Sequence, residues 1–302
     1  MIIGKPRTES TTLKALKFLN TRMSLSEEDK RYYLNLLKGY EGEIMFDSMT
    51  EKLECDCIIL NDLLLEVNNS TFQIDTLIIT SEIIYPFEVK NNSGDYYYES
   101  DKMYTMNKIE INNPLNQLRK NNSLLNRLLH LLGHKLPIVD SVVFINPEFT
   151  LYQAPMDLPL IFPGQVHRTL QKVDATQSKL TRQHKLLAEK LVSLHMDDSR
   201  FSKLPSYNYH SLRKGIVCKN CHSFLVSISG SACICQNCHT KESVTEAVIR
   251  SANEFQLLFP NEKMTTGLIH DWCKIVSSKK RISRILQKNF KQIYLNRWTY
   301  FK

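Results

Sequence analysis

Residues 71–91 read TFQIDTLIITSEIIYPFEVKN, and this stretch holds the most informative pattern in the chain. Two apolar runs with a short polar break between them predict two buried strands joined as a hairpin. Asp75 lies in the first strand, and Glu88 and Lys90 end the second. Charged groups are costly to bury without a partner or an ion. These three residues are therefore candidates for a functional site.

Glu88 and Lys90 are two positions apart and project from the same face of a strand. Asp75 is expected to reach that face from across the hairpin. Two carboxylates beside an ammonium at a sheet edge are typical of a Mg²⁺ site, and a structural ion-pair cluster is the alternative. Pro86 cannot donate to a sheet ladder, which predicts a strand that begins near Phe87, or a bulge or edge there.

An aspartate followed on the next strand by Glu-x-Lys resembles the PD-(D/E)xK nuclease superfamily and, within it, the nuclease-related domain (NERD) family. The resemblance spans about residues 38–146 and is carried by Gly42-Glu43, Ile74-Asp75, Phe87-Glu88-Val89-Lys90-Asn91, Ser93-Gly94, Asn113-Pro114-Leu115 and Gln117. It implies an α/β fold in which a mixed sheet is flanked by helices.

The resemblance also implies a Mg²⁺- or Mn²⁺-dependent nuclease. Asp75 and Glu88 would hold the ion, and Lys90 would orient the attacking water or steady the charge on the phosphate. Glu43 would be a second-metal ligand or a base, and Gln117 would position water or phosphate. From the residues alone, a solvated side chain is the more usual interpretation of both Glu43 and Gln117, and the resemblance is what favours the functional one.

Two helices are predicted to carry Glu43 and Gln117. Ser24 with Glu27 predicts a capping box for a helix that runs to about residue 49. Asn113 followed by proline predicts the start of the second, which ends at residue 133. The first 22 residues show no informative pattern.

Further apolar runs predict the remaining strands. Runs at 57–60 and 63–67, broken by Asn61-Asp62, predict a meander that leads into the hairpin. Later runs at 139–145 and 158–162 predict two more strands. A helix is expected at 179–194, packed on the nuclease core or bridging to the next domain, with a linker at 197–209.

Two Cys-x-x-Cys pairs predict a zinc ribbon. They are Cys218 with Cys221 and Cys235 with Cys238. Four thiolates complete a tetrahedral Zn²⁺ site and leave no open position, so the ion would be structural. Redox-active cysteines are the alternative. The ribbon could also recruit a protein partner.

The positive charge of the chain is concentrated at its C-terminus. The formal net charge is +8, and the segment from Lys274 to the end holds nine basic residues and no acidic one. Three helices are predicted at 244–259, 265–273 and 278–290, which is typical of a helix-turn-helix that binds DNA. The last helix carries the candidate nucleic-acid-binding residues Lys279, Lys280, Arg281, Arg284 and Lys288. A basic, solvated helix is the alternative.

The 302 residues are long enough for several domains. We expect a nuclease-like domain at 1–170, a bridging helix and linker at 171–210, a zinc ribbon at 211–242 and a basic helical domain at 243–302. No apolar stretch is long enough to span a bilayer, and no signal-peptide pattern is visible, so a cytoplasmic protein without membrane contact is expected.

Together these features predict a nuclease that cleaves DNA and is targeted by its ribbon and basic helices. The alternative is a non-catalytic nucleic-acid-binding or adaptor protein built on a nuclease fold. An intact set of Asp75, Glu88, Lys90, Glu43 and Gln117 favours the enzyme.

Overall fold

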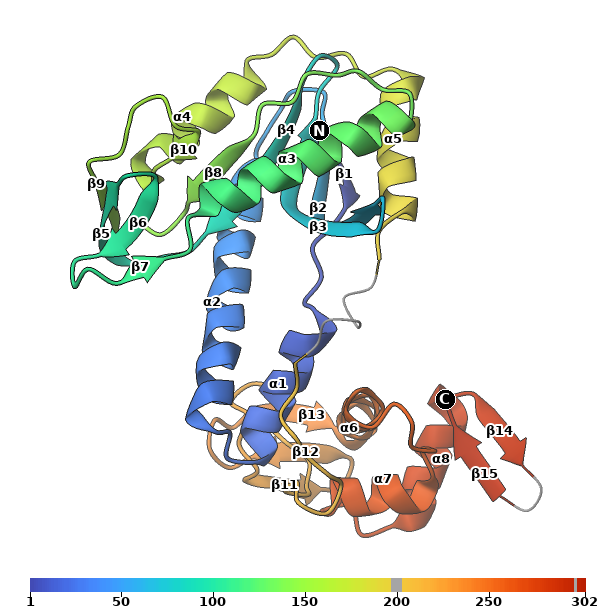
Figure 1. Ribbon diagram of the computed structural model, residues 1–302. Helices are drawn as coiled ribbons and strands as arrows, with labels where there is room; N and C mark the ends of the chain where they lie inside the picture. Colours follow the sequence, from blue (N-terminus) through green and yellow to red (C-terminus); the bar gives the residue numbers. More distant parts are fainter. Residues whose placement is uncertain (197–202, 296–297) are drawn as a thin grey trace. The chain divides into compact units, whose positions relative to one another are not determined.

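A computed structural model describes residues 1–196, 203–295 and 298–302. The chain divides into two compact units, and each unit combines an N-terminal segment with a later one (Figure 1). Unit 1 is Met1–Ser10 with Leu34–Phe201, and unit 2 is Thr11–Tyr33 with Ser202–Lys302.

Unit 1 is built around a six-stranded mixed sheet with the order β1-β2-β3-β4-β8-β10. The strands are β1 (Ile2–Lys5), β2 (Ile58–Val67), β3 (Ser70–Ile79), β4 (Ile84–Lys90), β8 (Ser141–Phe144) and β10 (Leu160–Ile161). The β2-β3-β4 meander is antiparallel, whereas β1, β8 and β10 join by parallel pairing. The predicted α/β fold with a mixed sheet is confirmed.

Helices cover both faces of this sheet. Side chains of α3 (Pro114–Leu131) and α5 (Arg182–Ser193) pack on one face. Side chains of α2 (Glu27–Thr50) and α4 (Pro163–Asp174) pack on the other. Figure 1 shows α3 crossing the strands. Because α5 packs on β2, it belongs to unit 1 rather than to a bridge, and the predicted linker begins at residues 197–202, outside the described part.

A second, four-stranded sheet lies in unit 1, with the order β7-β6-β5-β9. Its strands are β5 (Gly94–Glu99), β6 (Lys102–Thr105), β7 (Glu110–Ile111) and β9 (Phe149–Tyr152). Tyr98 of this sheet is buried in a core shared with α3 and β8. Tyr97 stacks on Tyr104 of the neighbouring strand, with ring centroids 5.2 Å apart.

Asn61-Asp62 does not separate two strands, contrary to the prediction, because β2 continues through it. Asp62 adopts a left-handed conformation with φ of 54°. The apolar alternation of β2 and β3 shifts by one residue at this place, where Asp62 lies opposite Asp75. The shift shows in the residues that pack toward α3 and α5: Leu60 and Leu63 from β2, and Leu77 and Ile74 from β3.

Pro86 lies within β4, which begins at Ile84 and runs between β3 and β8, so the predicted strand start near Phe87 or edge position is wrong. The Ile84 N–H donates toward the β8 side, to the Pro137 carbonyl, and Pro86 two residues later faces the same side. The ladder from β4 to β8 starts only at Phe87. The missing N–H of Pro86 thus falls at a gap in the ladder.

Unit 2 holds the ribbon and the C-terminal helices around one core. Its elements are α1 (Thr11–Arg22), β11 (Val226–Ser229), β12 (Ala232–Cys235), β13 (Lys241–Ser243), α6 (Val244–Leu258), α7 (Thr266–Cys273), α8 (Lys279–Asn289), β14 (Gln292–Leu295) and β15 (Trp298–Phe301). Cys233 of the ribbon, Trp272 of α7 and Leu19 of α1 belong to the same buried cluster. The division at 242/243 therefore does not separate two cores.

Three local features differ from the sequence interpretation. The first 22 residues, which showed no pattern, form β1 and α1. The cap of α2 is Ser26 rather than Ser24, because the Asp29 N–H donates to the Ser26 hydroxyl at 3.1 Å. The C-terminus forms a β-hairpin, β14-β15, after the three predicted helices.

Candidate active site and metal centre

Asp75 lies where the β3–β4 ladder ends. The last residues that pair across the two strands are Thr76 and Phe87. Beyond this pair, the backbone N–H of Val89 in β4 donates a hydrogen bond to Asp75 Oδ2 at 2.8 Å. Asp75 is only 5% exposed. Burial raises the pKa of this carboxyl, although the charge of Lys90 and the Val89 N–H act against the rise. Asp75 therefore lies just beyond the last paired residues of the hairpin, at the position where the alternation of β2 and β3 shifts.

Glu88 and Lys90 project together toward α3. Their neighbours Phe87 and Val89 pack in the core on the α2 face, so the alternate residues point to the other face. Lys90 Nζ donates to Glu88 Oε1 at 2.7 Å. Burial, then the charge of Asp75, raises the pKa of Glu88 to about 7. Burial alone would lower the pKa of Lys90, but the charges of Glu88 and Asp75 raise it.

Gln117 joins this group from the first turn of α3. Asn113 caps the helix, and its side chain accepts a hydrogen bond from the Leu115 N–H at 3.0 Å. The next residue, Pro114, occupies the first turn, where no N–H is needed. Gln117 Oε1 accepts a hydrogen bond from Lys90 Nζ at 3.2 Å. Lys90 therefore connects the strand carboxylate to the helix amide.

Gly42 lets α2 approach the end of β4, which positions Glu43. A Cβ atom at Gly42 would lie 2.5 Å from the Cβ of Asn91. At this contact, Asn91 Nδ2 donates a hydrogen bond to the Lys38 carbonyl at 2.7 Å. Its Oδ1 accepts one from the Asn146 side chain at 2.9 Å. The helix carrying Glu43 is thus fastened to the strand carrying Glu88 and Lys90.

Arg7, which the sequence interpretation missed, binds the acidic residues of α2. Its guanidinium contacts Glu43 Oε2 at 2.7 Å and Asp47 Oδ2 at 2.8 Å, and its side chain is 1% exposed. It also donates to the Asp75 carbonyl at 2.7 Å. Burial, then the charge of Asp75, raises the pKa of Glu43 to about 8, although Arg7 opposes the rise. An isolated arginine in a polar segment gives no sequence signal for such a role.

The candidate residues thus form two groups that meet at Asp75. Glu88, Lys90 and Gln117 lie on the α3 face, whereas Glu43 is held on the α2 side by Arg7. Hydrogen bonds use one carboxylate oxygen of Asp75 and one of Glu88. Among the described residues no hydrogen bond uses the second oxygen of either, and such an oxygen is a hard ligand of the kind that Mg²⁺ and Mn²⁺ prefer. The donor set therefore fits a divalent ion.

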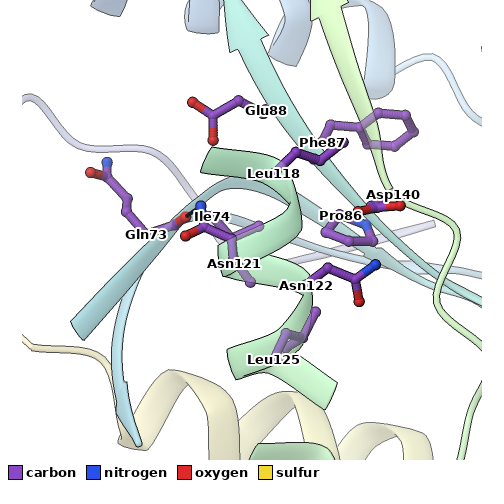
Figure 2. A pocket seen from close by; sticks show the side chains of 10 residues that line it. All are labelled: Gln73, Ile74, Pro86, Phe87, Glu88, Leu118, Asn121, Asn122, Leu125 and Asp140. Carbon is purple, nitrogen blue, oxygen red and sulfur yellow. Dashed lines mark hydrogen bonds between the residues drawn. The ribbon is translucent and has the colours of Figure 1, made fainter. Parts of the chain in front are cut away.

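A small cavity adjoins this site between β4 and α3 (Figure 2). Its volume is about 10 Å³, which is near the lower limit for one water molecule. Figure 2 shows Glu88 at one end of the lining and Leu125 at the other, with Pro86 and Asp140 beside the gap in the ladder. The cavity thus lies where Pro86 interrupts the pairing of β4 with β8.

The four predicted zinc ligands lie together in unit 2. They are Cys218, Cys221, Cys235 and Cys238, whose sulfurs all lie within 4.8 Å of one another. Within the described residues, this is the one group of three or more His, Cys, Asp or Glu that is so compact. Backbone N–H groups of Asn220 and Asn237 point to sulfurs at 3.4 Å. Cys233, left out of the predicted set, is buried in the core instead.

The basic residues of α8 divide by exposure. Ile282, Ile285 and Leu286 are buried in the core of unit 2. Four basic residues are exposed: Lys279, Lys280, Arg284 and Lys288. Arg281 is half-buried and donates to the Gly230 carbonyl at 2.9 Å, so it connects α8 to the ribbon.

Within the described residues, no helix is long and apolar enough to cross a membrane. In comparison with known protein families, residues 38–145 fit the sequence model of the nuclease-related domain (NERD) family. No curated protein and no solved structure matches the chain. The matched segment contains Glu43, Asp75, Glu88, Lys90 and Gln117. The chain therefore carries a nuclease-related domain at residues 38–145.

Proposed function

We propose that this protein is a Mg²⁺- or Mn²⁺-dependent nuclease that hydrolyses phosphodiester bonds of DNA. The observation that carries the proposal is the connected set at the end of β4. Lys90 binds both Glu88 and Gln117, at 2.7 Å and 3.2 Å, and Asp75 is fixed beside them by the Val89 N–H.

Each residue has a role that its position supports. Asp75 and Glu88 would hold the ion, which supplies charge neutralisation and activation of water when bound. Lys90, which keeps its positive charge between two carboxylates, is placed to orient a water or to stabilise charge on the scissile phosphate. Gln117 offers its amide N–H₂ at the N-terminal turn of α3, where anions are favoured.

The test is cleavage of linear, circular, single-stranded and double-stranded DNA and of RNA with Mg²⁺ or Mn²⁺. Asp75→Asn and Glu88→Gln should each abolish cleavage, and Lys90→Ala should abolish it while much of the metal affinity remains. Asp95→Asn, an exposed carboxylate on β5, is the matched control and should cleave normally. Wild-type protein that binds nucleic acid but cleaves none of these substrates would leave the non-catalytic alternative.

We also propose that the four clustered cysteines bind one structural Zn²⁺. Their spacing in sequence and the sulfur distances of 3.5 Å and 3.6 Å support this assignment. Metal analysis of protein purified without chelators should find about one zinc per chain. Cys221→Ser should lose it and Cys55→Ser should retain it. Zinc-free protein with four titratable thiols would show the assignment to be wrong.

We infer that the exposed basic face of α8 contacts the phosphate backbone of the nucleic acid. The helix buries its apolar side and leaves four positive side chains in solvent. Positive charge on one helix face is the electrostatic footprint of a polyanion partner.

A further inference from the structure

Arg7 has an unusual position for an arginine beside a candidate metal centre, because its guanidinium is almost fully buried. It forms a two-point contact with Asp47, through Nε at 2.8 Å and Nη2 at 3.1 Å. Nη1 binds Glu43 Oε2 at 2.7 Å. Nη2 also reaches the Asp75 carbonyl at 2.7 Å and the Thr76 hydroxyl at 3.2 Å. The guanidinium therefore bridges α2 to the strand that carries Asp75.

The carboxyl groups around Asp75 outnumber the cations. The carboxylates that act on one another here are Glu43, Asp47, Asp62, Asp75 and Glu88. The cations among them are Lys5, Arg7 and Lys90. When all five carboxylates are ionised, they exceed the three cations by two charges. Without an ion, protonation of Glu43 and Glu88 relieves this excess, in keeping with their raised pKa values, and one divalent ion would relieve it in the ionised state. Buried charges that stay uncompensated are strongly unfavourable.

The geometry also divides the carboxylates. Asp75 and Glu88 lie beside Lys90, whereas Glu43 has one oxygen occupied by a fixed guanidinium. A second divalent ion at Glu43 would lie next to the buried positive charge of Arg7, and burial weakens the dielectric screening of their repulsion. Arginine keeps its charge throughout the accessible pH range, so this obstacle is permanent.

We propose that Arg7 takes the place of a second metal ion, so that the centre binds one divalent ion, at Asp75 and Glu88. Glu43 then acts as a partner of Arg7 rather than as a metal ligand. The proposal rests on the proposed metal-dependent function, but it concerns the number of ions and can fail while that function stands.

The experiment counts Mn²⁺ ions per chain on zinc-loaded protein, by titration with electron paramagnetic resonance. Wild type should bind one Mn²⁺ and Glu88→Gln should bind it at least tenfold more weakly, which locates the ion. Arg7→Met removes the charge but keeps an apolar stem, and it should bind two. Arg7→Lys keeps the charge and should bind one.

A double variant repeats the test with better charge compensation. Arg7→Met with Asp47→Asn removes Arg7 together with its other carboxylate partner, so Glu43 is free to ligate and two Mn²⁺ are expected. This variant also folds more readily if Arg7→Met alone leaves its carboxylates too poorly compensated. Two ions on wild type, or one ion on folded Arg7→Met or on the folded double variant, would overturn the role of Arg7. No Mn²⁺ on wild type would instead refute the metal centre itself.

Discussion

Buried carboxyl groups make the stability of unit 1 depend on pH. The pKa values of Glu88 and Glu43 rise from 4.5 to about 7 and about 8, chiefly through burial. The folded protein holds these protons more tightly than the unfolded chain does. Their contribution to the free energy of unfolding is therefore complete below pH 4.5 and is lost as the pH rises through about 7 and 8.

Asp75→Asn tests this dependence, because the charge of Asp75 is the second cause of both raised pKa values. Without Mg²⁺ or Mn²⁺, we expect the variant to equal or exceed wild type in stability above pH 8 and to show a weaker pH dependence. Denaturant unfolding at several pH values measures this. A structural ion pair with Lys90 predicts the opposite, a loss of about 3–5 kcal/mol.

Two glycines of α2 offer a matched comparison. Gly42→Ala brings a methyl group to within 2.5 Å of Asn91, which should cost about 1–3 kcal/mol by overpacking. Gly39→Ala meets nothing within 4 Å and should stabilise the helix by roughly 0.5–1 kcal/mol. Thermal melts of both variants suffice. Equal effects of the same sign would mean that the contact with Asn91 does not fasten α2.

At the residue scale, sequence reasoning succeeded where the relevant contacts are close along the chain. Glu88 and Lys90 share a strand face, and Asp75 reaches them through the hairpin. Arg7 was missed because it lies 68 positions from Asp75 and no periodic pattern surrounds it. Burial of an arginine depends on which distant acids enclose it, and the sequence alone does not contain that information.

Among the elements, α8 carries the prediction on nucleic-acid binding. Removing the segment from residue 274 onward is unsuitable, because Ile282, Leu286 and Phe301 within it belong to the core of unit 2. Substitution of its four exposed basic residues with glutamine avoids this problem. Lys279, Lys280, Arg284 and Lys288 are those residues.

We expect the fourfold α8 variant to bind DNA more weakly and with a flatter salt dependence. Each lost phosphate contact lowers the slope of log K against log salt by about 0.7–0.9. Lys185→Gln with Lys190→Gln, which removes exposed charges from α5, is the control and should change neither quantity. Unchanged binding in the fourfold variant would identify the basic face as solvated only.

The helices and strands themselves were predicted unevenly. Strong signals such as Asn113-Pro114 and the cysteine pairs gave α3 and the ribbon. Helix α1 was overlooked although Leu13, Leu16 and Leu19 recur at helical spacing, because polar residues dominate its composition. The continuity of β2 through Asn61-Asp62 depends on pairing with β3, which compensates a turn-forming dipeptide.

For the whole molecule, the buried clusters of the two units are separate and predict two unfolding transitions. Arg22 and Glu254 form a buried ion pair within unit 2, at 2.6 Å, and Arg22 lies over Trp272 at 4.0 Å. Glu254→Ala should destabilise the transition of unit 2 by about 3–5 kcal/mol and leave that of unit 1 unchanged. Calorimetry measures both, with Glu262→Ala as the exposed control. A single transition that shifts as one would contradict this division.

Unit 2 is built from two segments that are far apart in the sequence, which has a consequence for folding during synthesis on the ribosome. Helix α1 leaves the exit tunnel early, but Glu254, the partner of Arg22, emerges 232 positions later. At about 5–20 residues per second, that interval is roughly 10–50 s. During this time the core residues that Ala15 and Leu19 later pack against have not yet been synthesised. Helix α1 is therefore the segment that stays available for chaperone binding longest. The nuclease-related domain, by contrast, has been synthesised completely before unit 2.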